Sequence, residues 1–257
     1  MVQDNTQQDF GDLRQLFAKA HVVEELQTAW PSSFEVVSEF WRAPIESSHL
    51  TPRMKELILL AMHASATALN QDATVRHVDR AKQAGATDHD ILDVLVSIIG
   101  LANHALYFSV PILEEELKAA GREPAILPPV DPEFEKIKEN FLEVRGFWNS
   151  EREPLARLIP QYFKALTKLG IESWQRGSLT RKERELICVG IDCSVTHTYA
   201  PGLRIHMRNA IACGATREEI LEVLQLAALL GVETFVTGAN ALYDGQHREG
   251  ADSSVAK

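Results

Sequence analysis

Two glutamate–histidine pairs, each separated by 21 residues, are the side chains of this sequence best suited to chemistry. They are Glu56 with His77 and Glu185 with His206. Each glutamate stands near the start of an otherwise apolar helical segment, where a buried carboxylate needs a partner. A histidine opening the next antiparallel helix would supply it, and the carboxylate would tune that imidazole for proton transfer. We predict that these four residues are catalytic; the alternative is a structural pair that fixes helix packing.

Further polar residues recur at matched positions around the two pairs. His63 lies two helical turns after Glu56, so both share one face, and Asp192 stands in the same place after Glu185. The predicted polar sets are Glu56, His63, His77 and His104 in one half, and Glu185, Asp192, His206 and Glu233 in the other. Arginines beside the histidines would hold a substrate carboxylate. The predicted substrate-binding residues are His63, His104, Arg76, Asp192, Tyr199, Arg204 and Glu233.

No cofactor is expected, because none of the spacings forms a local metal motif. The alternative is a divalent metal, such as zinc, iron or manganese, held in the first half by His63, His77, His104 and Glu56. The three cysteines, Cys188, Cys193 and Cys213, form neither an even disulfide framework nor a zinc pattern. Reduced thiols in a cytoplasmic protein are the expectation.

The elements that position these residues occur twice. A shift of 129 residues places 51–95 on 180–224 without a gap, and 15 of the 45 pairs are identical. Such self-similarity predicts a duplicated structural unit. The predicted repeats span 10–121 and 133–246, joined by a proline-rich linker, 122–132, with a disordered polar tail at 247–257.

Each copy is predicted to be all-α. Thr51 precedes Pro52 at a helix start, and Thr180 and Glu183 form a capping box. Gly85 and Gly214 are placed to end the histidine-bearing helices. The predicted helices include 10–28, 31–42, 52–69 and 103–120 in the first copy, and 133–150, 154–169, 181–197 and 232–246 in the second.

Composition narrows the possible partners. The formal net charge of −10 argues against nucleic acid, which requires a basic face. The most apolar run, 91–102, is too short to span a bilayer and contains Asp93, and the polar N-terminus is unlike a secretory signal. We therefore expect a cytoplasmic protein with a small-molecule substrate and no nucleic-acid or membrane partner.

The duplicated stretch resembles the carboxymuconolactone decarboxylase and alkylhydroperoxidase D-like superfamily. The matching marks are a Glu-Leu-Ile helix start, a histidine opening the next helix, and Gly-Ala-Thr followed by an Ile-Leu-Asp/Glu-Val-Leu helix, in that order in both copies. The resemblance implies an all-α bundle, two tandem repeats that form a pseudo-symmetric pair, and assembly into a homo-oligomer. It also implies a pocket between the glutamate-bearing and histidine-bearing helices.

The chemistry implied by the resemblance depends on a cysteine pair that this chain lacks. Peroxidase-like members carry Cys-x-x-Cys-x-x-x-His, whereas Asn70 and Ala73, and Tyr199 and Gly202, occupy those places here. The sequence therefore favours a lyase or isomerase that uses Glu–His acid–base chemistry on a small organic acid or lactone. The alternatives are a peroxidase with non-standard cysteines, the metal-dependent enzyme above, and a non-catalytic helical scaffold that binds a small molecule.

Overall fold

The computed structural model of the protein describes residues 9–122 and 128–252, of which 244–252 are described by their backbone alone, and these residues form helices and no strands. The first copy contains α1 (Ala20–Ala29), α2 (Pro31–Ile45), α3 (Pro52–Ala64), α4 (Gln71–Gln83), α5 (Asp88–Ile99) and α6 (His104–Ala119). The second contains α7 (Phe134–Arg145), α8 (Arg152–Leu158), α9 (Pro160–Arg176), α10 (Arg181–Cys193), α11 (Ala200–Ala212), α12 (Arg217–Ala228) and α13 (Val232–Asp252).

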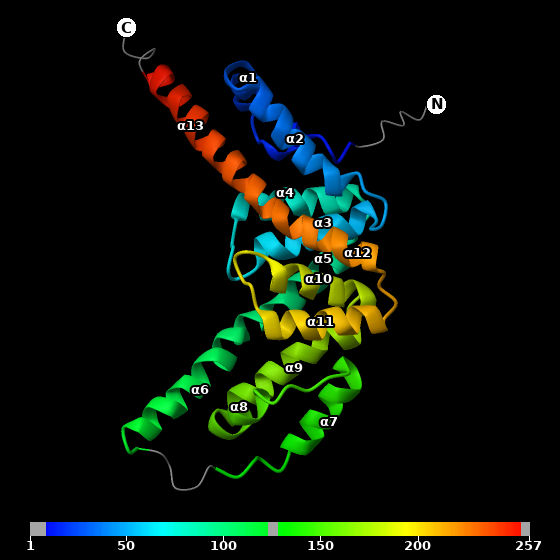
Figure 1. Cartoon of the computed structure of the whole chain (residues 1–257), viewed down its shortest axis with the longest axis vertical. Coiled ribbons are helices and arrows are strands. Elements are labelled where there is room, and N and C mark those ends of the chain that lie inside the picture. The colour runs from blue at the N-terminus through cyan, green and yellow to red at the C-terminus, as the bar shows by residue number, and fades with distance from the viewer. Residues whose placement is uncertain (1–8, 123–127, 253–257) are drawn as a thin grey trace.

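The two glutamate-bearing helices, α3 and α10, lie at the centre of the molecule and pack against each other (Figure 1). Both are buried along nearly their whole length, as their apolar sequences predict. The histidine-bearing helices α4 and α11 pack on α3 and α10 respectively. Thr67 and Thr196, which match at the offset of 129, meet with their hydroxyl oxygens 3.4 Å apart. This contact between equivalent residues is what a pseudo-twofold arrangement of the copies requires.

Two buried ion pairs at matched positions tie the copies together crosswise. Lys55 of α3 lies 2.8 Å from Glu222 of α12, and Arg184 of α10 lies 2.5 Å from Asp93 of α5. All four side chains are at most 2 % exposed. Because a buried charge without its partner is costly, these pairs oppose separation of the copies.

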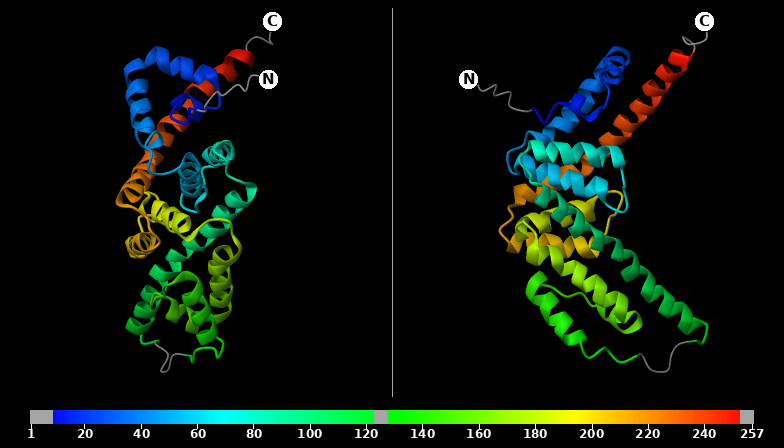
Figure 2. Two further views of the ribbon diagram at one scale, coloured as in Figure 1. Left: turned by 90° about the vertical axis from the view of Figure 1, so that its right-hand side faces the viewer. Right: turned by 180° about the vertical axis from the view of Figure 1, so that it is seen from behind.

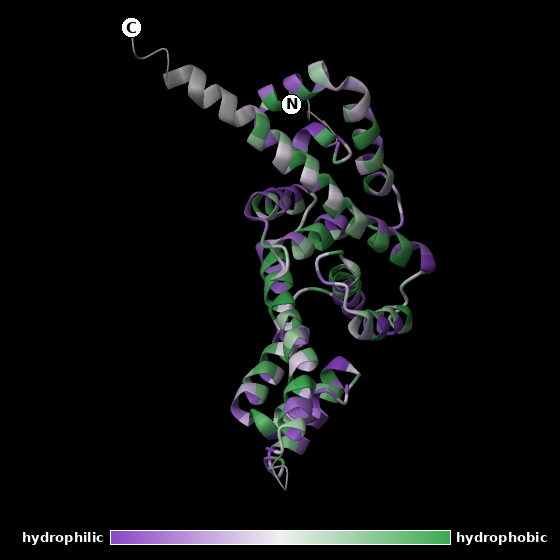
Figure 3. Cartoon of the chain, turned by 60° about the vertical axis from the view of Figure 1, so that its left-hand side comes forward, coloured by the Kyte–Doolittle hydropathy of each residue, from purple (hydrophilic) through white to green (hydrophobic). Residues whose placement is uncertain are grey.

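The last helix of each copy crosses to the other half. Short 3₁₀ turns, η2 (Gly100–Asn103) and η3 (Leu229–Gly231), join α5 to α6 and α12 to α13. As a result α6 packs on α8, whereas α13 packs on α1 (Figure 2). The rods 88–119 and 217–243 are long and apolar enough to cross a membrane by length and composition. Each rod nevertheless carries one carboxylate of the central ion pairs, Asp93 in the first rod and Glu222 in the second, so each rod packs into the protein core. Hydrophobic residues run through the middle of the molecule (Figure 3).

Several predicted helix boundaries are wrong. The predicted helix 154–169 is two helices, α8 and α9, because Pro160 has no N–H to continue α8. The predicted helix 10–28 contains a 3₁₀ turn, η1 (Leu13–Leu16), and regular helix begins only at Ala20. The predicted tail, 247–257, overlaps α13 as far as Asp252; residues 253–257 lie outside the described residues. Within the predicted linker, 122–132, the described residues are not helical, and 123–127 also lie outside.

Candidate active site

In the first copy, Glu56 and His77 form a buried pair. Glu56 Oε2 lies 2.7 Å from His77 Nδ1, and Arg80 donates to the other carboxylate oxygen from Nε and Nη2 at 3.0 and 2.8 Å. Burial raises the pKa of Glu56, but the hydrogen bond from His77 and the charge of Arg80 outweigh it and hold the pKa below its usual value. Burial lowers the pKa of His77. The ionised carboxylate is therefore stabilised by His77 on one oxygen and by Arg80 on the other.

In the second copy, His206 and Glu185 repeat this contact with a different neighbour. His206 Nδ1 lies 2.6 Å from Glu185 Oε2, and Asn209 Nδ2 donates to Glu185 Oε1 at 3.1 Å. Asn209 stands where the first copy has Arg80, so a neutral amide replaces a guanidinium. When Nδ1–H of His206 donates to the carboxylate, its Nε2 is left for a substrate proton.

His104 belongs to the second site and not to the first. Its Nδ1 lies 2.7 Å from His197 Nε2 and 3.8 Å from Asp192 Oδ1. The ring of Tyr199 stacks on the ring of His104 at a centroid distance of 3.8 Å. Because α6 crosses over, the predicted metal set His63, His77, His104 and Glu56 is wrong: His104 lies in the other half.

Glu233 correspondingly belongs to the first site. It forms an ion pair with Arg76 and lies 3.9 Å from His63 Nε2. The rings of His63 and His77 stack with 3° between their planes. Burial lowers the pKa of His63 to about 2. Arg76 is thus already paired inside the protein, which opposes its predicted role as a substrate ligand.

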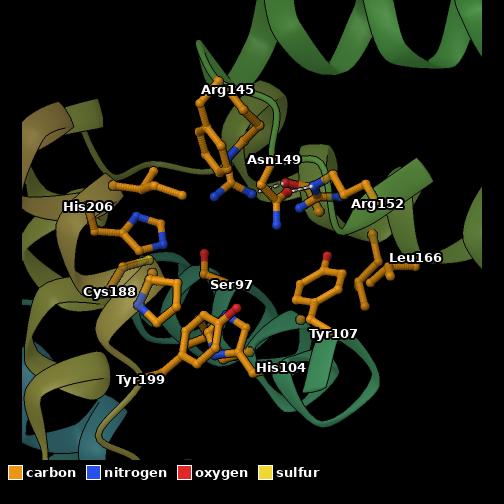
Figure 4. A pocket seen from close by; sticks show the side chains of 18 of the residues that line it. Ser97, His104, Tyr107, Arg145, Asn149, Arg152, Leu166, Cys188, Tyr199 and His206 are labelled. Carbon is orange, nitrogen blue, oxygen red and sulfur yellow. Dashed lines mark hydrogen bonds between the residues drawn. The ribbon is translucent and has the colours of Figure 1, made fainter. Parts of the chain in front are cut away.

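A cavity of about 70 Å³ opens beside His206 at the second site. It is lined by both copies: α5 and α6 supply one wall, and α7, α8, α9, α10 and α11 supply most of the rest (Figure 4). The polar and sulfur-bearing side chains that line it include Ser97, His104, Tyr107, Arg145, Arg152, Cys188, Tyr199 and His206. Arg204, predicted to bind substrate, is exposed and is not among the lining residues, because it points away from the helix face that carries His206.

Two arginines line this cavity, as does Glu151, whose charge acts to raise the pKa of Arg152. Arg145 donates to the carbonyl of Gly170 at 2.7 Å and its Nε has no hydrogen-bond partner. Arg152 donates to Asn149 Oδ1 at 2.7 Å. Neither guanidinium forms an ion pair with a carboxylate within residues 9–122 and 128–243. Burial lowers the pKa of Arg145 to about 10 and also lowers that of Arg152. Unpaired guanidinium groups facing a cavity are suited to bind an anion.

Sequence reasoning missed both arginines. At the offset of 129, Arg152 matches the buried Val23 of α1. The available signal was that an arginine in one copy aligns with a buried valine in the other. It went unused because the leading helices match too weakly to be compared position by position.

The cysteines do not form a thiol pair suited to peroxide chemistry. Cys188 lines the cavity, but burial raises the pKa of its thiol far above the usual value. Burial also raises the pKa of Cys193 to about 11. Since the thiolate is the reactive form, both groups are poor nucleophiles at neutral pH.

Comparison with known proteins places this architecture in a family. The model of the carboxymuconolactone decarboxylase family matches residues 31–103 and 160–244. A crystal structure from Burkholderia xenovorans LB400, described as a "putative gamma-carboxymuconolactone decarboxylase subunit", is similar over 92 % of this chain and 95 % of its own, with 32 % identity and a TM-score of 0.83. No curated protein matches. Two family segments in one chain agree with the duplication, and the protein belongs to the carboxymuconolactone decarboxylase family.

Proposed function

We propose that the protein is a decarboxylase-like lyase acting on a small organic acid or lactone, and that the second site performs the reaction. The observation that carries the proposal is the convergence on one cavity of a carboxylate-oriented imidazole, His206, and two guanidinium groups that form no ion pair with a carboxylate among the described residues. The first site has no equivalent: its carboxylates are paired with Arg80 and Arg76.

The residues divide the chemistry between binding and proton transfer. Arg145 and Arg152 bind the substrate anion and the carbonyl oxygen that gains charge in the transition state. As the carbon–carbon bond to the carboxylate breaks, CO₂ leaves and the bonding electrons pass into the conjugated carbonyl as an enolate. His206, protonated at Nε2, delivers a proton to the enolate carbon, and Glu185 stabilises the imidazolium. His206 then regains a proton from the solvent, so that overall the substrate carboxylate and one solvent proton become the product and CO₂.

The test is turnover of gamma-carboxymuconolactone, the compound named in the description of the similar crystal structure. Turnover is measured as release of CO₂. We expect His206→Gln to lower kcat by about 100-fold or more, the usual contribution of a general acid. His77→Gln is the matched control, because it changes the equivalent histidine of the first copy, and we expect it to leave kcat within a few-fold. Equal activity of wild type and His206→Gln on this or another identified substrate would refute the mechanism.

A further inference from the structure

Asp192 is a buried carboxylate without a partner. Its side chain is 0 % exposed, and neither oxygen has a hydrogen-bond partner within the described residues. Burial raises its pKa to about 7. The chain makes room for it: Gly202 lies so close that a Cβ there would collide with Oδ2, whereas the first copy has Ala73 at the same place. An unsatisfied buried carboxylate is expensive, so its position needs an explanation.

Two imidazole nitrogens face the same oxygen. Asp192 Oδ1 lies 3.8 Å from His104 Nδ1 and 3.6 Å from His197 Nε2, and those two nitrogens are 2.7 Å apart. Ligands bound at 2.0–2.2 Å around a tetrahedral metal are separated by about 3.3–3.6 Å. The separation of 3.6 Å meets this value, that of 3.8 Å is slightly longer, and that of 2.7 Å is shorter. Small movements of the two rings would therefore place all three atoms around one ion.

We propose that His104 Nδ1, His197 Nε2 and Asp192 Oδ1 bind a divalent transition metal of the zinc or iron type. Two imidazoles and one carboxylate suit these ions, whereas Mg²⁺ prefers oxygen ligands alone. Three protein ligands leave a coordination position open to water or to an oxygen of a bound molecule. His104 and His206 both line the cavity, so this position lies next to it. His206 itself is no ligand in this arrangement: its Nε2 approaches the other oxygen, Oδ2, at 4.0 Å.

The matched cluster in the first copy provides the contrast. His63, His77 and Glu233 also lie close enough to share an ion. His77 Nε2 has no hydrogen-bond partner among the described residues and could serve as a ligand, but Glu233 is paired with Arg76. A metal at that place would have to compete with Arg76 for the Glu233 carboxylate, whereas Asp192 forms no ion pair with an arginine or lysine among the described residues, so we assign the ion to the second cluster.

Metal binding is tested without substrate. The purified full-length protein is stripped with EDTA, dialysed, and titrated with Zn²⁺ by calorimetry and with Co²⁺ by visible absorption. We expect one equivalent of each to bind the wild type, and Asp192→Asn and His104→Gln each to weaken binding at least 100-fold. His63→Asn and Glu233→Gln, at the positions matching Asp192 and His104, are the controls and should bind as the wild type does. Mg²⁺ should not compete.

Folding of the variants is followed at the same time. Zn²⁺ should raise the Tm of the wild type but not that of Asp192→Asn, which removes an unpaired buried charge and should itself be at least as stable. A full equivalent bound by Asp192→Asn, or no Zn²⁺ bound by the wild type at micromolar concentration, would overturn the proposal. Metal binding is separable from the proposed lyase activity, because His206→Gln should lose turnover and still bind Zn²⁺.

Discussion

Arg145 gives the sharpest test of the second site as an anion-binding site. Replacing it with methionine keeps much of the apolar stem and removes the charge. In the structure the guanidinium contacts the carbonyl of Gly170 and lies 4.2 Å from the centre of the Trp174 ring, without a carboxylate partner in the described part of the chain. If the charge exists to hold a substrate anion, Arg145→Met should impair binding while leaving the fold intact.

Two magnitudes follow from the surroundings of Arg145. Burial lowers its pKa from 12.5 to about 10, a difference of 2.5, which corresponds to a cost of about 3 kcal/mol for keeping the charge inside. This is an upper bound, because the residue as a whole is only half-buried. The hydrogen bond and the stacking on Trp174 return about 1 kcal/mol each. The free energy of unfolding of Arg145→Met should therefore lie within about 1 kcal/mol of wild type, or slightly above it.

The effect on catalysis should be much larger than the effect on stability. Loss of a charge-assisted, bidentate contact with the substrate is worth about 3 kcal/mol, or about 100-fold in kcat/KM. The assays are steady-state kinetics and urea unfolding, with Arg76→Met as the matched control. That variant leaves the partly buried Glu233 without its partner, so we expect it to cost about 2–3 kcal/mol of stability, less than a fully buried pair would, and to change kcat/KM little. A loss of more than 2 kcal/mol in Arg145→Met with unchanged kcat/KM would show that Arg145 is structural.

Other expected outcomes concern the two carboxylate sites and the core. Glu185→Gln should lower kcat about 100-fold, whereas Glu56→Gln should leave kcat unchanged and lower the free energy of unfolding. Kinetics and urea unfolding are measured on the same preparation of each variant. Lys55→Met should cost about 3–5 kcal/mol in urea unfolding, because it leaves Glu222 buried and unpaired, and a hydrophobic replacement of both residues should recover most of it. Although burial raises the pKa of Asp90, its hydrogen bonds and the charge of Arg53 hold it below 3.8. Because the folded-state pKa is the lower one, the stability it contributes is present above pH 3.8 and lost as the pH falls below it; Asp90→Asn should flatten that part of the acid unfolding curve.

The sequence predicted the centre of the fold well, because each signal there is local. Thr51 and Thr180 cap the helices as predicted, and the two Glu–His pairs form at the predicted positions. Apolar residues all around α3 and α10 correctly indicated buried helices. Capping boxes and periodicity depend on neighbours within a few residues, so a single sequence suffices to find them.

The exchange of α6 and α13 was not predictable in the same way. The residues at 100–103 and 229–231 form 3₁₀ turns that continue the rod instead of reversing the chain direction. No proline or turn motif in the sequence distinguishes a continued rod from a reversal. Whether a rod folds back or crosses over is decided by which apolar faces it meets. Tyr107, for example, packs with Phe134 and Phe163 of the other copy. The grouping of His104 with His63 failed for this reason alone.

The differences between the two sites follow one pattern: carboxylates lose their arginine partners at the second site, and unpaired charges appear there. This pattern argues against simple decay of one copy. At the first site the carboxylates of Glu56 and Glu233 have guanidinium partners from Arg80 and Arg76. At the second, Asn209 and Ile205 stand in place of those arginines. New charges appear there as Arg152 and Asp192; among the described side chains Arg152 forms no ion pair, and Asp192 has only histidines within ion-pair distance. Random loss would remove polar groups, whereas here the charge of Arg152 is kept at the cavity and that of Asp192 in the buried cluster beside it, at a cost in stability that a bound ion or substrate would offset.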